Sequence, residues 1–333
     1  MDAESRRPPF YLGIDLGGTN IKAGVVDDDG RPVSSVSLPT RAELGPVVGL
    51  DNLTEAGRKA VEASGLSIDD IAQVGLGSPG TMDIPGGLLI DPPNLPGWVD
   101  LPIRRLLEER IGRPTILQND GNAAAYGEYW AGAGRGARSL VMFTLGTGVG
   151  GGIIHEGRII EGEHSHGGEC GHIVVQMDGG RTCSCGGVGH LEAYASATAI
   201  VRRAVEAIET TPGSLLYTIQ ARGELTSRDV NDAAEAGDPL ARRLMRETAR
   251  YLAVGATTLM HTINPDLILF GGGVIAAGPK FLDDIRSEIH RIAFPTVADR
   301  TRVDYAMLGG SAGFIGAAGC ARLAHRGLAP TER

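Results

Sequence analysis

The stretch "YLGIDLGGTNIKAGVVD", residues 11–27, decides the fold class. Apolar residues alternate on both sides of Gly17–Gly18, which predicts two strands joined by a glycine turn. The segment "LVMFTLGTGVGGGIIHEG", residues 140–157, repeats this plan of buried strand, Gly-Thr-rich turn and second strand. A strand–turn–strand pattern that occurs twice indicates an internally duplicated architecture.

Between the hairpins, Leu, Ala and Ile recur at helical spacing. We expect helices over 46–63, 101–111, 121–132, 190–208, 238–262 and 311–325. The segment "LPIRRLLEERIG" ends in Gly112, where a C-cap is expected. A third strand, "LILFGGGV" (267–274), runs into glycines and then a helix-like stretch. Strands that alternate with helices predict an α/β protein with mixed sheets.

A chain of 333 residues is long enough to form two lobes. The strand "TILQND" runs directly into the helix "GNAAAYGEYW", which places the lobe boundary there. We expect a small α/β lobe of residues 1–119 plus 311–333, to which the last helix returns. Residues 120–310 then form a large α+β lobe.

Composition narrows the function classes. The net charge of −9 argues against nucleic acid or an acidic membrane surface as partner. No apolar run approaches the roughly 20 residues that cross a bilayer, and "MDAESRRPPF" lacks the apolar stretch of a signal peptide. We therefore expect a cytoplasmic protein whose four cysteines do not form a disulfide framework. The 50 glycines lie between Val, Ile and Leu runs, so they indicate tight turns and close approaches rather than low complexity.

The glycine loops do not match the common nucleotide motifs. The Walker pattern is absent, and the two G-x-G-x-x-G matches, 75–80 and 146–151, lead into a turn and a strand instead of a helix. We expect instead that the amides of the hairpin turns bind phosphate. Asp15, at the end of a buried strand, suits Mg²⁺ held by few carboxylates and substrate phosphates. The alternative is that Asp15 only caps the turn.

Six motifs occur in the order seen in ROK-family sugar kinases, and the chain resembles the bacterial glucokinase branch of that family. They are "DLGGTNIKAGVVD", "LGSPG", "PNLPGW", "QNDGNAAAYGE", "TLGTGVGGGI" and "GECGHIVV…CSCGGVGHLEAYAS". The resemblance covers nearly the whole chain. It implies a two-lobed fold of the actin-like and hexokinase-like type, with a duplicated ribonuclease H-like motif and a ligand cleft between the lobes.

The resemblance implies that Asp120 is the catalytic base, which accepts the proton of a sugar 6-hydroxyl during phosphoryl transfer. The structural alternative for Asp120 is a helix N-cap. Asn119 is expected to orient the sugar through its ring hydroxyls. Glu169, His172 and Glu192 match the sugar-contacting positions of the family, and Asn94 is a further candidate from the other lobe.

For the nucleotide, the resemblance assigns phosphate contacts to two glycine turns, and base or ribose contacts to a third glycine segment. Lys22 either reaches a phosphate or is a solvated strand residue. The phosphate candidates are Gly17, Gly18, Thr19, Thr147 and Gly148, and the base or ribose candidates are Gly272 and Gly273.

The family usually has C-x-C-G-x-x-G-C, whose three thiolates bind a structural zinc together with the histidine of "GH". Here Cys183, Cys185 and His172 match, but His190 replaces the third cysteine. Zinc accepts two thiolates and two imidazoles at tetrahedral geometry, so we expect Zn²⁺ at these four residues. A disulfide, a redox pair and an empty site are the alternatives. Two further cysteines, Cys170 and Cys320, are expected in the core, and two further histidines, His164 and His166, in a loop that rims the sugar pocket.

The resemblance implies an ATP- and Mg²⁺-dependent kinase that makes glucose 6-phosphate. Another ROK substrate remains open (N-acetylglucosamine, N-acetylmannosamine, fructose or allose), as do a donor other than ATP and a sugar sensor without turnover. ROK repressors carry a DNA-binding region before the first hairpin. Here that hairpin begins by residue 11, so we do not expect a repressor. The resemblance implies a homodimer or homotetramer.

Overall fold

The computed structural model describes residues 8–328 and divides into two compact units. The first contains residues up to 137, 152–168 and those from 307, and the second contains 138–151 and 169–306. The division therefore falls within a strand of the second sheet, whereas the lobe boundary between residues 119 and 120 stays a prediction. The ends of the predicted small lobe, 1–7 and 329–333, lie outside the described residues.

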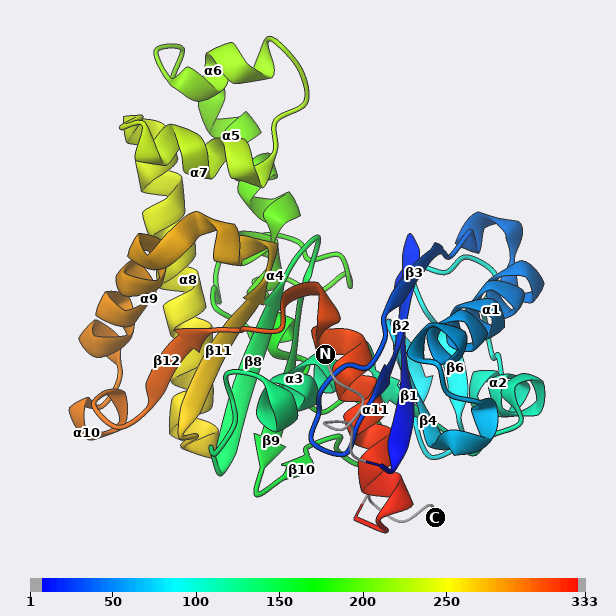
Figure 1. Cartoon of the computed structure of the whole chain (residues 1–333). Coiled ribbons are helices and arrows are strands. Elements are labelled where there is room, and N and C mark those ends of the chain that lie inside the picture. The colour runs from blue at the N-terminus through cyan, green and yellow to red at the C-terminus, as the bar shows by residue number, and fades with distance from the viewer. Residues whose placement is uncertain (1–7, 329–333) are drawn as a thin grey trace. The chain divides into compact units, whose positions relative to one another are not determined.

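The first sheet has five strands in the order β3-β2-β1-β4-β7, of which β1 to β4 are labelled in Figure 1. The strands β1 and β2 are antiparallel, as are β2 and β3, whereas β4 is parallel to both β1 and β7. The first predicted hairpin is thus present. The bounds are β1 (Phe10–Leu16), β2 (Asn20–Val26), β3 (Val36–Pro39), β4 (Ile71–Ser78) and β7 (Thr115–Asn119), with a separate hairpin of β5 (Thr81–Asp83) and β6 (Leu88–Asp91).

The helices of the first unit are α1 (Pro46–Ser64), α2 (Ile103–Ile111), α3 (Asp120–Ala131) and α11 (Ala312–His325). Each lies within two residues of its predicted bounds, and Gly112 is the left-handed C-cap of α2. Apolar residues of β1, β4, α1 and α2 form one buried cluster that includes Leu12, Ile14, Leu53 and Leu107.

Glycines let α11 lie directly on the first sheet. A Cβ added at Gly13 of β1 would lie 1.8 Å from the carbonyl oxygen of Phe314. One added at Gly75 of β4 would lie 1.8 Å from the carbonyl oxygen of Ala317. Such distances exclude any side chain, so the two glycines are needed for this helix–sheet contact. Beside β1 and β4, α11 also packs against α3.

The second sheet repeats the plan of the first, in the order β10-β9-β8-β11-β12. Strand β11 is parallel to both of its neighbours, β8 and β12. The bounds are β8 (Ser139–Leu145), β9 (Val149–His155), β10 (Arg158–Ile159), β11 (Leu267–Gly272) and β12 (Arg302–Tyr305). Two five-stranded sheets with the same order confirm the α/β class and the duplication expected from the two hairpins.

The remaining helices belong to the second unit (Figure 1). They are α4 (Glu192–Ala195), α5 (Ala197–Ile208), α6 (Leu215–Gln220), α7 (Ser227–Glu235), α8 (Pro239–Ile263), α9 (Gly278–Ile292) and α10 (Pro295–Ala298). The single helix predicted over 190–208 is wrong, because Ser196 is extended and its side chain accepts a hydrogen bond from the Ala199 amide. That side chain starts α5 as a new helix and ends α4.

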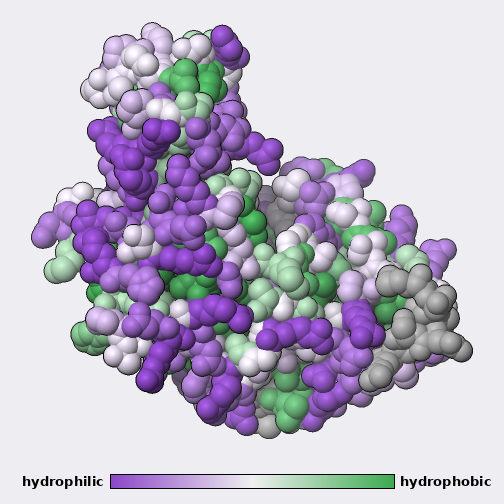
Figure 2. Space-filling view, turned by 60° about the vertical axis from the view of Figure 1, so that its left-hand side comes forward, coloured by the Kyte–Doolittle hydropathy of each residue, from purple (hydrophilic) through white to green (hydrophobic). Residues whose placement is uncertain are grey.

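The surface is largely polar on the face shown in Figure 2, where hydrophobic residues form small scattered groups. Within residues 8–328, no helix combines the length and the apolar character that a membrane span requires.

Candidate functional site

The carboxyl ends of β1, β4 and β7 lie side by side in the first unit. Asp15 of β1 pairs with Gly77 of β4, and Ser78 pairs with Asn119 of β7. Ligands of α/β proteins bind at this edge of a sheet, because the strands end there and loops begin. The structure therefore brings the expected Mg²⁺ residue, Asp15, to the same sheet edge as Asn119 and Asp120.

The turn from β7 into α3 places Asn119 and Asp120. The Asn119 side chain accepts a hydrogen bond from the Asn122 amide at 3.1 Å, so Asn119 is the N-cap of α3. Asp120 is the first residue of the helix, and its Oδ1 accepts from the Gly121 amide at 2.8 Å. The cap position is thus filled by Asn119, which removes the N-cap explanation for Asp120. The helix dipole favours a carboxylate at this position.

Asp15 is partly buried, and this burial raises the pKa of its carboxyl group, with the Lys22 ammonium acting in the opposite direction. Lys22 lies directly opposite Asp15 in the β1–β2 ladder. Its Nζ donates to the carbonyl oxygen of Gly310, 3.0 Å away, so Lys22 ties β2 to the segment that precedes α11. A cation beside Asp15 would favour the ionised carboxylate and so offset the cost of its desolvation, which suits Mg²⁺.

The first glycine turn meets Asn94, another expected site residue. The Gly17 amide donates to the carbonyl oxygen of Asn20 at 3.0 Å and closes the turn. A Cβ added at Gly18 would lie 3.0 Å from the carbonyl oxygen of Asn94. Thr19 and Asn94 are exposed. The motifs "DLGGTN" and "PNLPGW" are therefore neighbours in the first unit, although about 75 residues separate them along the chain.

The second unit has its own glycine turn at the carboxyl end of β8. The Gly146 amide donates to the carbonyl oxygen of Gly148 at 3.0 Å, and Thr147 is exposed. In the β8–β11 ladder Gly272 pairs with Leu145, so Gly272 and Gly273 follow the same sheet edge. Gly272 has φ +85°, and a Cβ there would lie 2.3 Å from the Leu145 carbonyl oxygen. The expected phosphate turn and the expected base or ribose segment are thus adjacent.

His172, Cys183, Cys185 and His190 lie together, with their ligand atoms within 4.8 Å of one another. Cys183 Sγ is 3.8 Å from His172 Nδ1, and Cys185 Sγ is 3.2 Å from His190 Nδ1. Zn–S bonds of ~2.3 Å and Zn–N bonds of ~2.0 Å at tetrahedral angles require about 3.5 Å between S and N. The four side chains therefore fit a zinc ion. The thiols are free, which speaks against the disulfide, and the buried Cys170 and Cys320 are core residues as expected.

Glu169 and His172 flank the start of this cluster. The second ring nitrogen of His172, Nε2, is 3.9 Å from a Glu169 carboxylate oxygen. His172 thus directs one nitrogen to the cysteines and the other to a sugar-contact candidate. Glu169 is exposed, as are His164 and His166 in the preceding loop.

Glu192, the third sugar-contact candidate of this unit, connects the zinc segment to the glycine turn. Its Oε2 accepts from the Val149 amide at 3.0 Å, and its Oε1 accepts from the Ser184 hydroxyl and, at 3.3 Å, from Cys183 Sγ. A Cβ added at Gly148 would lie 2.5 Å from Oε2. The sequence offered no signal for these contacts.

Similarity to known proteins extends over nearly the whole chain. The model of the ROK family matches residues 11–324. The chain belongs to the ROK family. It is 39% identical over 308 residues to a glucokinase of Halalkalibacterium halodurans, covering 92% of this chain and 93% of that protein.

Two solved ROK structures are similar to this chain. A ROK hexokinase from Thermus thermophilus is 36% identical, with a TM-score of 0.82 over 96% of this chain and 99% of the other. A ROK family glucokinase from Streptomyces griseus, in complex with glucose and AMPPNP, is 36% identical, with a TM-score of 0.79 over 94% and 99% of the two chains. The expected actin-like ROK fold with two lobes is thereby confirmed.

Glu128, in the "QNDGNAAAYGE" motif, has a structural role that the sequence did not indicate. Glu128 is fully buried, and its oxygens accept from the main-chain amides of Ala133, Met307 and Leu308. Two of these donors lie about 180 residues further along the chain, so no local pattern indicates them.

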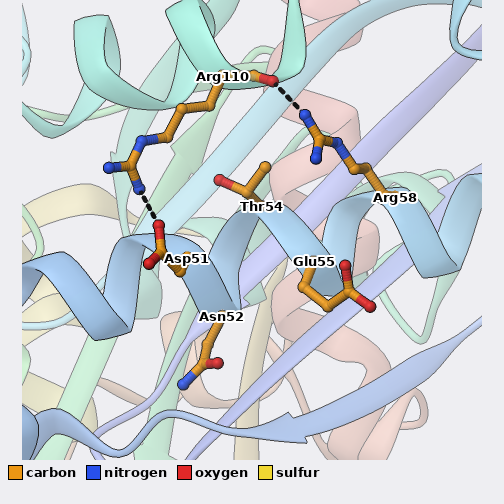
Figure 3. Close-up of a pocket in the computed structure, with 6 residues that line it drawn as sticks. All are labelled: Asp51, Asn52, Thr54, Glu55, Arg58 and Arg110. Atoms are coloured by element: carbon orange, nitrogen blue, oxygen red, sulfur yellow. Dashed lines mark hydrogen bonds and ion pairs between the residues drawn. The ribbon is translucent and has the colours of Figure 1, made fainter.

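A polar pocket between α1 and α2 contains none of the expected site residues (Figure 3). The Arg110 guanidinium binds the Asp51 carboxylate, and the Arg58 guanidinium donates to the Arg110 carbonyl oxygen. Both guanidinium groups therefore make hydrogen bonds within the protein. The lining residues are Asp51, Asn52, Thr54, Glu55, Arg58 and Arg110.

Proposed function

We propose that this ROK protein is a glucokinase, which transfers the γ-phosphoryl group of ATP to the 6-hydroxyl of glucose. The observation that carries the proposal is the similarity to the Streptomyces griseus enzyme in complex with glucose and AMPPNP, which covers 94% of this chain at 36% identity. The Halalkalibacterium halodurans glucokinase, at 39% identity, supports the same substrate.

In this reaction Asp120 is the general base. The 6-hydroxyl oxygen bonds to the γ-phosphorus while the bond from that phosphorus to the bridging oxygen breaks and releases ADP. The hydroxyl proton passes to the Asp120 carboxylate. The position of Asp120 in the first turn of α3 supports the role, because the amino end of a helix favours the ionised form that accepts a proton. Asn119 and Asn94 bind sugar hydroxyls.

Phosphate binding is assigned to the two glycine turns and Thr19 and Thr147, whose amides and hydroxyls donate to phosphate oxygens. Gly272 and Gly273 line the base or ribose. Bound Mg²⁺ would neutralise charge on the phosphates of ATP, and Asp15 would hold it. Lys22 acts through Gly310, whose carbonyl oxygen it binds, and so fixes the strand opposite Asp15.

Zinc has a structural role in this proposal, because four protein ligands close its coordination shell. His172 directs Nδ1 to the cysteines and Nε2 toward Glu169. Ligation through Nδ1 would fix the tautomer that donates from Nε2 to a sugar hydroxyl. Glu169 and Glu192 accept from further hydroxyls. We also propose a cytoplasmic homodimer or homotetramer, and the net charge of −9 supports the absence of a nucleic-acid or membrane partner.

The test is a coupled assay of the full-length protein with ATP, Mg²⁺ and a hexose panel. We expect the highest kcat/KM with glucose among glucose, N-acetylglucosamine, N-acetylmannosamine, fructose and allose. Asp120→Asn should lower kcat by about 10³-fold, since the proton loses its acceptor, and should still bind glucose. Asp232→Asn, an exposed aspartate on α7, is the matched control. A sensor would bind glucose without turnover, and undiminished turnover by Asp120→Asn would exclude the role of Asp120.

A further inference from the structure

A buried amide lies directly before the Asn119–Asp120 pair. Gln118, at the end of β7, is 2% exposed. Its Oε1 accepts from the Asn119 amide at 2.8 Å and from Asn122 Nδ2 at 3.3 Å. A side-chain amide has one donor end and one acceptor end, so the partner of its Nε2 decides which way it points.

That partner is Glu161. Gln118 Nε2 donates to Glu161 Oε1 at 2.6 Å, across 43 positions of the chain. Glu161 is partly buried, and burial raises the pKa of its carboxyl group, with the hydrogen bond from Gln118 opposing the shift. Without this acceptor, the Gln118 donor would be buried with no partner, or the amide would rotate and release the Asn119 amide.

The loop that carries Glu161 is closed by one internal hydrogen bond and is joined to the rest of the first unit by two others. The Gly167 amide donates to the Glu161 carbonyl oxygen at 2.6 Å, and the Gly167 carbonyl oxygen accepts from Asn122 Nδ2 at 3.5 Å. Ser165 Oγ accepts from the Ile84 amide at 3.0 Å. These bonds and the one from Gln118 together hold the Glu161 carboxylate against the end of β7.

We propose that Glu161 is a positioning residue, which acts through the Gln118 amide to fix the main chain of Asn119 and thereby the direction of the Asp120 carboxylate. The inference rests on the proposed function, in which Asp120 is the base. A shift of about 1 Å in a catalytic group can cost roughly 100-fold in rate. The contribution of Glu161 should therefore appear in kcat more than in the KM for ATP.

A charge swap tests this role in the full-length protein. Gln118→Glu places a carboxylate against Glu161, and the two repel each other unless they share a proton. We expect kcat to fall about 10- to 100-fold at pH 8 and to recover in part toward pH 6, relative to wild type at each pH. The double variant Gln118→Glu, Glu161→Gln restores a donor and an acceptor with reversed polarity, and the new carboxylate at 118 still accepts from the Asn119 amide. The kcat of the double variant should return to within about threefold of the wild-type kcat.

Gln73→Glu is the matched control, because it adds the same charge to β4 near the opposite end of the same sheet. If Gln118→Glu does not fold, Glu161→Leu replaces it, which removes the acceptor without adding charge, and kcat should fall at least fivefold. Wild-type kcat in the single variant, or a double variant no faster than the single, would overturn the role of Glu161. A wild-type protein that phosphorylates no hexose would instead overturn the proposed function.

Discussion

Replacement of Glu128 should destabilise the first unit strongly, because its carboxylate joins α3 to the segment before α11. The side chain is fully buried and accepts three main-chain hydrogen bonds, from Ala133 at 2.9 Å, Met307 at 2.8 Å and Leu308 at 2.6 Å. Bonds to a charged acceptor contribute about 1.5–3 kcal/mol each, and a buried donor without a partner is costly. Glu128→Ala removes all three bonds, and we expect a loss of at least about 4 kcal/mol in the free energy of unfolding.

Glu128→Gln allows a finer measurement. The amide oxygen can keep the bonds from Met307 and Leu308, but the NH₂ group then faces the Ala133 amide, so one charge-assisted bond is lost and two become neutral. The expected loss is about 2 kcal/mol. With a slope of about 2 kcal/mol/M, the urea midpoint should fall by about 1 M.

Tryptophan fluorescence is a suitable probe for this unfolding. The chain has two tryptophans, Trp98 and Trp130, and both lie in the unit that contains Glu128. The control is Glu109→Gln in the same unit, whose side chain is 56% exposed and pairs with Arg105, and its effect should stay below about 0.5 kcal/mol. If Glu128→Gln shifts the urea midpoint no more than this control, the reasoning from buried charge-assisted bonds is wrong.

Two further outcomes are expected in the second unit. Asp238 is buried, and although burial opposes the shift, hydrogen bonds from the Ala241 and Leu215 amides and Ser214 lower the pKa of its carboxyl group. A lowered pKa stabilises the fold above the unfolded value of about 3.9. Asp238→Asn should therefore lower the Tm at pH 7. The difference in Tm between wild type and variant should shrink as the pH falls below about 4. A difference that stays constant with pH in circular dichroism melts would contradict this. His190→Ala should weaken Zn²⁺ binding by more than about 100-fold in chelator competition, because loss of a residue that only hydrogen-bonds to a zinc ligand already costs up to about 100-fold. Unchanged Zn²⁺ affinity and stoichiometry would show that His190 is not a zinc ligand.

The sequence by itself determined the parts of this protein that local patterns encode. Alternating apolar residues around Gly17–Gly18 and in 140–157 predicted both hairpins, and helical spacing predicted α1, α3 and α8 within two residues. The four zinc-site candidates came from the resemblance to the ROK motif C-x-C-G-x-x-G-C, in which His190 replaces the third cysteine, and the structure brings all four together. Each of these features depends on residues that are near one another along the chain.

Only the tertiary structure decided which distant groups meet. The contacts of Gln118 with Glu161, of Glu128 with Met307, and of Gly13 with α11 join residues that are 43 to about 300 positions apart. Periodicity shows that a position is buried, but it does not show which backbone amide or side chain will lie opposite it. The partner is set by the packing of whole helices and strands, and the buried polar groups are then stable only where that packing supplies a donor or an acceptor.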